Sequence, residues 1–256
     1  MPWILRGLRN GIVTTRYPRH PDDYGSGFRG AIRVAPGAAG DLGGICPTGA
    51  IQADRGSVRL DQGRCILCGR CMQERPDLFS FDPATEIARL DRQALVVPDP
   101  ADDEDALEKV RADLGRRVRA LRRSVHVRHV DAGSDGSEEW EIYALLNPVY
   151  DVQRLGVFFT ASPRHADLLL VTGTGTLGMA GPLQRTYEAM PEPKIVVAAG
   201  TDAISGGLVH PSYATSGGIG DIVPVDVWVP GSPPSPFSLL HAILLGVGLL
   251  PQRGVA

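Results

Sequence analysis

Three cysteines within seven residues limit what this chain can fold into. Cys65, Cys68 and Cys71 have the spacing C-x2-C-x2-C in the stretch CILCGRC. Iron–sulfur ligand runs of the form C-x2-C-x2-C-x3-C-P share this spacing, and their fourth cysteine directly precedes a proline. Here Arg75 holds that fourth position and Pro76 follows it. The run therefore predicts a cluster whose fourth thiolate comes from another part of the chain.

The remaining cysteine, Cys46, lies 19 residues before Cys65 and precedes Pro47 in the stretch CPTGAI. In proteins with two such motifs, the Cys-Pro cysteine of each motif ligates the cluster of the other. We therefore expect one 4Fe–4S cluster, held by the four cysteines of the chain: Cys46, Cys65, Cys68 and Cys71.

A second cluster site of the same pattern has lost all of its cysteines. Counting back from Cys46 by the motif spacing places its ligands at Pro36, Ala39, Leu42 and Arg75. Because one complete set is kept and the other is entirely absent, the pattern indicates that one cluster is retained and its neighbour is lost.

Zinc is the alternative ligand of four thiolates, but zinc sites usually pair two separate C-x2-C knuckles. The distant Cys-Pro cysteine favours the cluster. Cysteines packed this closely indicate metal ligands in a reducing compartment instead of a disulfide framework.

Composition places the chain among globular proteins of one large or two ordinary domains. It has 256 residues, of which 43% are hydrophobic, and a net charge of -3, which gives no sign of a nucleic-acid partner. No signal peptide is visible, and the longest apolar run, residues 237–250, is shorter than a membrane span.

Residues 25–60 are rich in glycine and proline, as expected of a small loop-rich module. Residues 101–123 predict a helical linker with acids at its front and arginines at its back, an order that suits the helix dipole. A solvated face explains these arginines better than RNA binding, because no aromatic residues interleave with them. The apolar stripe of this helix is Leu107, Val110, Leu114, Val118 and Leu121.

From residue 125 onward, apolar β-branched runs alternate with helix-capable segments at 138–153 and 182–190. Such alternation predicts a mostly parallel sheet covered on both faces. Ser235 and Pro236 predict the start of a buried helix over 237–250. The five predicted strands lie in the stretches VHVRHV, GVFFTA, DLLLVT, KIVVAA and DIVPVDVWV.

The stretch GTGTLG (173–178) matches the weak nucleotide pattern G-x-G-x-x-G, with Asp202 at a plausible distance for a ribose contact. Pro182 is expected to interrupt the helix that this loop should open. A nucleotide-binding oxidoreductase therefore remains a disfavoured alternative.

Residues 1–100 resemble the ferredoxin-type subunit of formate hydrogenlyase and related group 4 membrane-bound complexes, through GLRNGIVTTRYPRHPDD, CPTGAI and CILCGRC. Residues 124–256 resemble the small subunit of group 4 nickel–iron hydrogenases and its complex I counterpart, the 20 kDa-type subunit, through stretches such as SPRHADLLLVTG and VPVDVWVPGSPP. The resemblance implies a flavodoxin-like α/β domain over 124–256, joined by the linker 101–123 to a small α+β ferredoxin-like domain over 1–100.

The same resemblance implies a proximal 4Fe–4S cluster in the second domain, yet no cysteine follows Cys71. The family's ligand positions correspond to Asp135, Glu138, Asp202 and Ser232, which we call the vestigial positions. Their oxygen atoms suit a hard cation such as magnesium. A hydrated or arginine-paired relic pocket is the favoured alternative, because three unpaired buried carboxylates would be costly.

The resemblance implies an electron-transfer and docking subunit with no catalytic residues of its own. Its expected partners are a hydrogenase or complex I-type large subunit and the membrane subunits of the same complex. These partners would hold the protein peripherally on the cytoplasmic face of the membrane. The alternative is a structural adaptor whose cluster lies outside a productive electron path.

Overall fold

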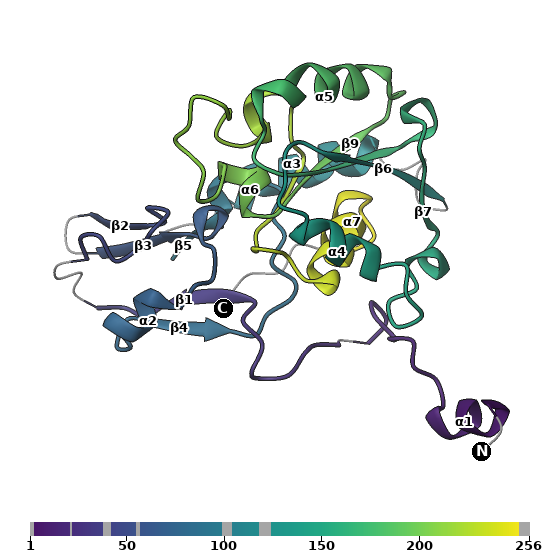
Figure 1. Ribbon diagram of the computed structural model, residues 1–256, viewed down its shortest axis with the longest axis horizontal. Coiled ribbons are helices and arrows are strands. Elements are labelled where there is room, and N and C mark those ends of the chain that lie inside the picture. The colour runs from purple at the N-terminus through teal and green to yellow at the C-terminus, as the bar shows by residue number, and fades with distance from the viewer. Residues whose placement is uncertain are drawn as a thin grey trace.

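The computed structural model describes residues 3–20, 22–37, 42–54, 57–98, 104–117 and 124–250. Figure 1 shows a large layered part with a central sheet and a smaller part built from two short sheets. We call the first the α/β domain and the second the cysteine module. Within the described residues, no helix is long and apolar enough to cross a membrane.

The α/β domain is built on a parallel five-stranded sheet in the order β10-β9-β8-β6-β7. All residues of the two central strands β8 and β9 are buried, which explains their continuous apolar runs. Numbered within the sheet, this is the 2-1-3-4-5 order of flavodoxin-like folds, and the predicted fold class is confirmed. The strands are β6 (Val125–Asp131), β7 (Val157–Phe159), β8 (Leu168–Thr172), β9 (Ile195–Ala199) and β10 (Val227–Val229).

Different helices cover the two faces of this sheet. Leu170 of β8 packs in one core with α4 and α7, whereas its neighbour Leu169 packs in a second core with α5 and α6. This division follows from the alternation of side chains along a strand. The helices are α4 (Ser137–Ala144), α5 (Leu177–Ala189), α6 (Thr201–Ser205) and α7 (Pro236–Gly246).

Two of these helices test the sequence predictions directly. Ser235 caps α7 by accepting a hydrogen bond from the backbone of Ser238, and every residue of α7 is buried, as predicted. The prediction for Pro182 was wrong, because α5 begins at Leu177 and continues through this proline. Pro182 lies in the second turn of α5, where it removes one backbone donor without ending the helix.

The cysteine module has two antiparallel sheets and one short helix, α2 (Arg70–Glu74). This arrangement confirms the predicted small ferredoxin-like part with α and β elements. One sheet pairs β1 (Ala31–Val34) with β4 (Phe79–Asp82), and the other contains β2 (Ile51–Asp54), β3 (Ser57–Asp61) and β5 (Val96–Val97).

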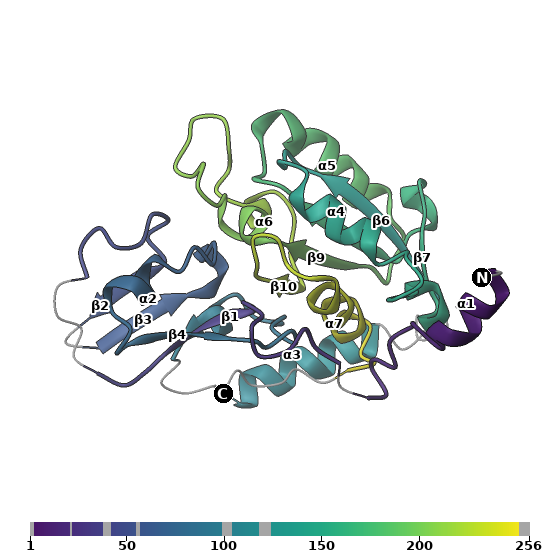
Figure 2. The same cartoon turned by 60° about the horizontal axis from the view of Figure 1, so that its bottom comes forward.

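The module and the α/β domain share part of one core. Arg89 and Trp228 of β10 exchange two backbone hydrogen bonds of 2.8 Å, so the module adds a bridge to the edge of the large sheet. Leu90 is buried in the same core as α7. Figure 2 shows the two parts side by side, with α3 (Glu104–Arg117) running beneath them.

The predicted stripe of α3 is only partly described by the structure. Leu114 is buried in the large core, whereas Val110 is exposed. Val118 and Leu121 lie outside the described residues.

An aromatic cluster attaches the segment before β1 to the α/β domain. The ring of Phe237 in α7 lies 5.6 Å from the ring of Tyr17, 5.1 Å from Tyr24 and 5.2 Å from Tyr150. Tyr17 and Phe237 are both buried. Aromatic pairs at such distances add to the stabilisation from buried area, so Phe237 should fix the path of residues 17–24.

We expect Phe237→Ala to lower the free energy of unfolding by about 3–5 kcal/mol, because it opens a cavity among three rings. Denaturant-induced unfolding would measure the loss. Phe158→Ala, at a partly exposed position, serves as the control and should cost less than about 1 kcal/mol. Equal losses in the two variants would contradict the role given to Phe237.

Candidate iron–sulfur site

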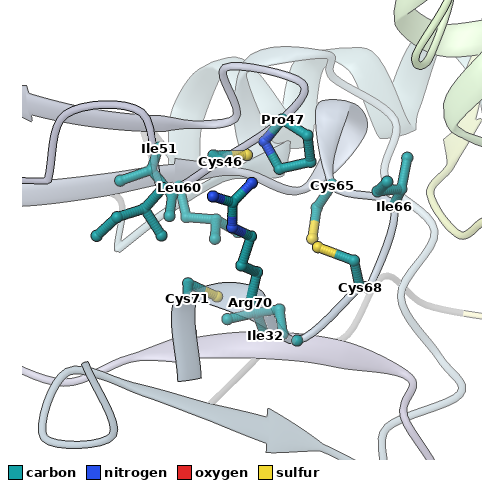
Figure 3. A pocket seen from close by; sticks show the side chains of 12 residues that line it. Ile32, Cys46, Pro47, Ile51, Leu60, Cys65, Ile66, Cys68, Arg70 and Cys71 are labelled. Atoms are coloured by element: carbon teal, nitrogen blue, oxygen red, sulfur yellow. The ribbon is translucent and has the colours of Figure 1, made fainter. Parts of the chain in front are cut away.

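The four cysteines of the chain line one recess of the cysteine module, although they come from two loops and a helix. Figure 3 shows Cys65 and Cys68 with their sulfur atoms toward each other, and Cys46 and Cys71 on other sides of the recess. The recess has a volume of about 320 Å³, part of it open to solvent. Its remaining lining is mostly apolar: Ile32, Ile45, Pro47, Ile51, Leu60, Ile66, Gly69 and Arg70.

The backbone between the cysteines is folded tightly around this recess. Leu67 has a φ of +53° and Gly69 a φ of +74°. A positive φ is unusual for leucine and is found where the surrounding structure enforces it, often at a functional site. Gly69 then starts α2, which places Cys71 in its first turn.

Backbone amides are directed at the cysteine sulfurs. The N–H of Ala50 donates to Cys46 Sγ at 3.2 Å, and the hydroxyl of Thr48 lies 3.4 Å from the same atom. The amides of Leu67 and Met72 favour the thiolates of Cys65 and Cys71, respectively, by lowering their pKa values. Amide donors of this kind stabilise sulfur atoms that carry negative charge.

Burial opposes this effect and is larger. It raises the pKa of Cys65 to about 12 and also raises the pKa of Cys71. Without a metal, both side chains are therefore neutral thiols at neutral pH. Binding of iron must displace their protons, so cluster assembly should be coupled to proton release.

The donor set fits a 4Fe–4S cluster, since four thiolates surround one largely apolar recess and none of them forms a disulfide. In the described part of the chain, no three His, Cys, Asp or Glu side chains are arranged to hold a single metal ion. Zinc would need its thiolates drawn to about 2.3 Å from one point, whereas a cubane cluster spreads its ligands around itself.

Two of the positions at which the sequence predicts a lost second cluster form other contacts. Arg75 forms a two-fold hydrogen-bonded ion pair with Asp77, at 2.9 and 2.7 Å. Leu42 belongs to the apolar core of the module together with Leu78. Gly37, next to Pro36, has a Leu78 methyl only 2.5 Å from where a Cβ would be. Ala39 lies outside the described residues.

The cysteine recess lies against the α/β domain. Thr201 of α6 is fully buried, and its hydroxyl donates to the backbone carbonyl of Cys65 at 3.0 Å. A smaller neighbouring recess is bordered by Cys65 and Leu67 on one side and by Pro230 and Gly231 on the other. The loop that would hold the cluster therefore contacts both α6 and the loop that follows β10.

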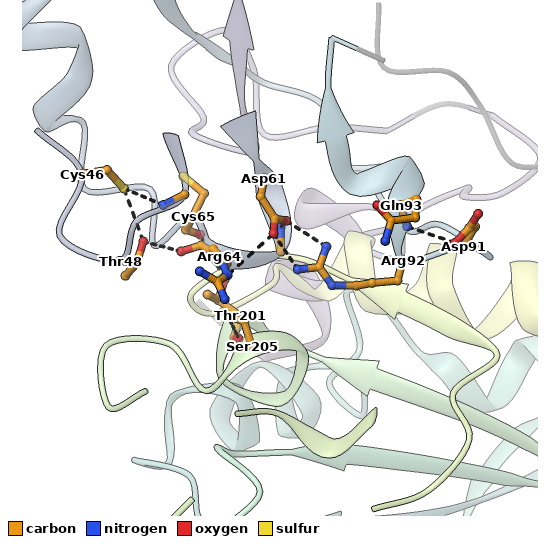
Figure 4. A network of polar contacts seen from close by, with 12 residues as sticks. Cys46, Thr48, Asp61, Arg64, Cys65, Asp91, Arg92, Gln93, Thr201 and Ser205 are labelled. Carbon is orange, nitrogen blue, oxygen red and sulfur yellow. Dashed lines mark hydrogen bonds and ion pairs between the residues drawn. The ribbon is translucent and has the colours of Figure 1, made fainter. Parts of the chain in front are cut away.

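Charged side chains fix this contact, as Figure 4 shows. Arg92 donates two hydrogen bonds to Asp61, at 2.9 and 2.6 Å, and Asp61 also accepts from the backbone of Gly63 at 2.9 Å. A Cβ at Gly63 would lie 2.7 Å from Ile204 of α6 and 3.0 Å from Arg92. Glycine is thus required for the turn at residues 62–64 to pack so closely on α6.

The vestigial positions lie in loops and in first helical turns that follow the carboxyl ends of the parallel strands, where open α/β sheets place their sites. Asp135 and Glu138 follow β6, Asp202 follows β9 and Ser232 follows β10. The charges of Asp135 and Asp202 each act on Glu138, and that of Asp135 acts on Asp202, so the three carboxyl groups share one region. Ser232, in the loop that follows β10, is exposed.

These carboxyl groups have different environments. Glu138 is 1% exposed, and burial raises its pKa from 4.5 to about 7. Burial also raises the pKa of Asp202, whereas hydrogen bonds from Ser137 lower that of Asp135. No described residue forms an ion pair with any of the three. Protonation of Glu138 would relieve the repulsion among the three groups.

Sequence reasoning missed a polar network close to the same edge of the sheet. Glu139 accepts hydrogen bonds from the hydroxyls of Thr172 and Ser134, and His129 Nε2 lies 3.0 Å from Thr172 Oγ1. Burial lowers the pKa of His129. The signal that could have indicated this network is the position of Thr172 at the carboxyl end of one predicted strand and of Glu139 after the adjacent strand.

The glycine-rich stretch 173–178 has no room for a nucleotide. Ser216 Oγ lies 2.5 Å from where a Cβ of Gly175 would be. The amide of Leu177, the first residue of α5, already donates to the carbonyl of Ala214 at 2.9 Å. Phosphate sites at helix N-termini need such amides free. Here the carbonyl of Ala214 accepts the hydrogen bond that a phosphate would otherwise take.

Comparison with known proteins gives two family matches. Residues 136–245 match the family described as "NADH ubiquinone oxidoreductase, 20 Kd subunit". Residues 58–112 match the family described as "4Fe-4S single cluster domain". The resemblance predicted from the sequence is thereby confirmed for both parts of the chain, and an iron–sulfur cofactor is supported.

Individual relatives agree with these families. The chain is 39% identical over 162 residues to formate hydrogenlyase subunit 7 of Escherichia coli, which covers 63% of this chain and 62% of that protein, less than two thirds of its length. It is 44% identical over 125 residues to a probable membrane-bound hydrogenase subunit of Pyrococcus furiosus, covering 49% of this chain and 75% of the relative. An uncharacterized protein of Methanocaldococcus jannaschii is 44% identical over 123 residues, covering 48% of this chain and 82% of the relative.

Among solved structures, a chain of a membrane-bound sulfane sulfur reductase, described as an archaeal respiratory membrane complex, is 32% identical. The match covers 51% of this chain and 70% of the other, with a TM-score of 0.43.

We expect Glu138→Gln to become more stable relative to the parent protein as the pH rises. The folded parent keeps a proton on Glu138 up to about pH 7, whereas the unfolded chain loses it near 4.5. The parent therefore loses stability between these pH values, and the glutamine variant does not. The difference between the two proteins should change by about 1–3 kcal/mol across this range.

Denaturant unfolding of both proteins below pH 4.5 and above pH 7 would measure this change. Glu188→Gln, at an exposed position of α5, is the matched control. A difference that stays constant with pH for Glu138→Gln would show that this carboxyl group is not protonated in the fold.

Proposed function

The chain belongs to the family of the 20 kDa subunit of NADH ubiquinone oxidoreductase, and from this premise we propose that it is an electron-transfer and docking subunit of a membrane-associated oxidoreductase complex. One 4Fe–4S cluster, ligated by the thiolates of the four cysteines, would supply the one-electron chemistry. The chain's own residues would supply the ligands, the N–H donors to sulfur and the contact between the two parts of the molecule.

The observation that carries this proposal is the shared recess of Cys46, Cys65, Cys68 and Cys71. Two loops far apart in sequence bring their sulfurs together, as expected for a site crossed between motifs. Its position supports a role in electron transfer, because Thr201 and Gly231 of the α/β domain border the cysteine loop. The cluster of the cysteine module would thus lie next to the edge of the sheet at which relatives with a proximal cluster would bind that second cluster.

The vestigial positions bear on how far electrons could travel from the cluster toward a large subunit. We propose that Asp135, Glu138, Asp202 and Ser232 replace the proximal-cluster ligands, since no cysteine follows Cys71. Hydrogenase activity would then lack its last relay. This absence favours the second candidate, a structural adaptor that holds a large subunit against membrane subunits with its cluster outside the electron path.

The two candidates differ in the behaviour of the cluster during turnover. In the intact complex, an electron-transfer cluster is reduced and reoxidised at the rate of the reaction, whereas a structural cluster keeps one oxidation state. The partners we propose are a hydrogenase or complex I-type large subunit and membrane subunits, which would place the protein at the cytoplasmic face of the membrane.

We expect Cys46→Ser to lose iron as severely as Cys68→Ser, because each removes one of four thiolates from the same cluster. Iron and sulfide analysis of the purified full-length variants, with EPR of the reduced samples, would measure the loss. Arg75→Ser is the matched control, because this residue lies at a motif position whose ion pair with Asp77 is exposed. It should keep the iron content of the parent.

Full iron content in Cys46→Ser would exclude Cys46 from the ligand set. Loss of iron in Arg75→Ser as large as in Cys68→Ser would show that the assay reports general instability of the module. One zinc per chain in the parent protein, with little iron, would exclude the cluster altogether.

A further inference from the structure

The first described helix, α1 (Trp3–Asn10), has no buried residue. In Figure 1 and in Figure 2 it lies outside the layers of the molecule, at the end opposite the cysteine module. Gly11 ends the helix with a φ of +64° and donates to the carbonyl of Gly7 at 3.2 Å. Every side chain of the helix is therefore exposed in the described part of the chain.

The apolar and charged side chains of α1 are segregated on opposite faces. Leu8 lies four positions after Ile4 and three after Leu5, so the three side chains form one face of the helix. Arg6 lies opposite this face, and Arg9 lies at its border. Apolar side chains in this segment are strongly exposed: Trp3 is 82% exposed, Leu8 76% and Ile12 86%.

The segment that follows α1 is attached to the body of the protein. The hydroxyl of Thr14 donates to the carbonyl of Pro148 at 2.7 Å, and the amide of Thr15 donates to the carbonyl of Val149 at 2.8 Å. Val149 is itself partly exposed, as is Leu146. The chain is thus anchored a few residues after the helix, while the side chains of the helix itself stay exposed.

The charge of the segment indicates what covers this face. Residues 3–20 contain the four arginines Arg6, Arg9, Arg16 and Arg19 and no acidic residue, in a chain whose net charge is -3. A helix with arginines on its polar side and with isoleucine and leucine on the other is typical of segments that lie in the interface of a membrane. Positive charge near the surface is attracted by anionic headgroups.

We propose that α1 lies in the headgroup region of an anionic lipid bilayer, with Ile4, Leu5 and Leu8 toward the acyl chains and the arginines at the phosphates. The protein then contacts the membrane directly, in addition to any contact through partner subunits. This inference does not depend on the cluster or on its electron path. It rests on the exposure of α1, the segregation of its side chains and its charge.

Flotation of the purified full-length protein with vesicles tests the proposal. One set of vesicles is pure phosphatidylcholine, and the other contains equal amounts of phosphatidylcholine and phosphatidylglycerol. We expect binding to the anionic vesicles that weakens with added salt. Arg6→Gln with Arg9→Gln should weaken it by about tenfold or more, and Leu5→Gln with Leu8→Gln by about tenfold or more.

Matched controls exist on the α/β domain. Arg164→Gln with Arg185→Gln removes the same charge, and Leu177→Gln with Leu208→Gln removes two leucines that are similarly exposed. Both control variants should bind vesicles as the parent does. Because α1 has no buried residue, its own substitutions should leave the unfolding transition unchanged, which circular dichroism would check.

Equal binding to neutral and anionic vesicles would overturn the proposal, and so would a Leu5→Gln, Leu8→Gln variant that binds like the parent. If this variant kept vesicle binding but no longer co-purified with its partner subunits, the helix would dock on a protein instead of on lipid.

Discussion

The contact between the cysteine loop and helix α6 is the constraint on which the arrangement of the molecule depends. The buried hydroxyl of Thr201 holds the carbonyl of Cys65, and Gly63 lets the adjacent turn approach Ile204. The ion pair of Asp61 and Arg92 then closes this turn from the side of the module. A change in any of these groups would move the proposed cluster relative to the sheet, because the same loop supplies two of its ligands.

The same contact brings the cysteine loop close to the vestigial positions of the α/β domain, because Thr201, which binds the carbonyl of Cys65, directly precedes Asp202. Three carboxyl groups share that place, and no described residue forms an ion pair with them. Burial raises the pKa of Glu138 to about 7 and also raises that of Asp202. Gly200 leaves space for the Glu138 carboxyl group, since a Cβ there would lie 2.5 Å from Glu138 Oε1. Burial of this kind favours the protonated form of Glu138, whereas a bound cation would favour the ionised form.

Sequence alone predicted the features that depend on local pattern. The apolar runs of the five strands, the Ser235 cap of α7 and the two-part fold follow from periodicity and capping rules, and the structure confirms them. The shared recess agrees with the predicted pairing of Cys46 with the run at 65–71, although the ligand assignment itself stays a prediction. The raised pKa of Glu138 and the network of Glu139 could not be predicted, because both depend on burial between segments far apart in sequence. Pro182 was misjudged because a proline early in a helix removes few backbone bonds.

The exposed helix α1 and the filled loop at Gly175 also show that a local sequence pattern does not reveal its function without the contacts made in the fold. The pattern at 173–178 matched a nucleotide motif, yet Ser216 occupies the space above Gly175. In the first residues, the alternation of leucine and arginine was visible in the sequence, but its meaning depends on the exposure of every side chain of α1, which only the structure gives.

The central claim is that this chain binds one cluster, in the cysteine module, and none in the α/β domain. The most direct test is EPR spin quantitation of the reduced full-length protein together with its iron content. The account predicts one reduced-cluster signal that integrates to one spin per chain, with about four irons. A second paramagnetic centre with about eight irons per chain would contradict it.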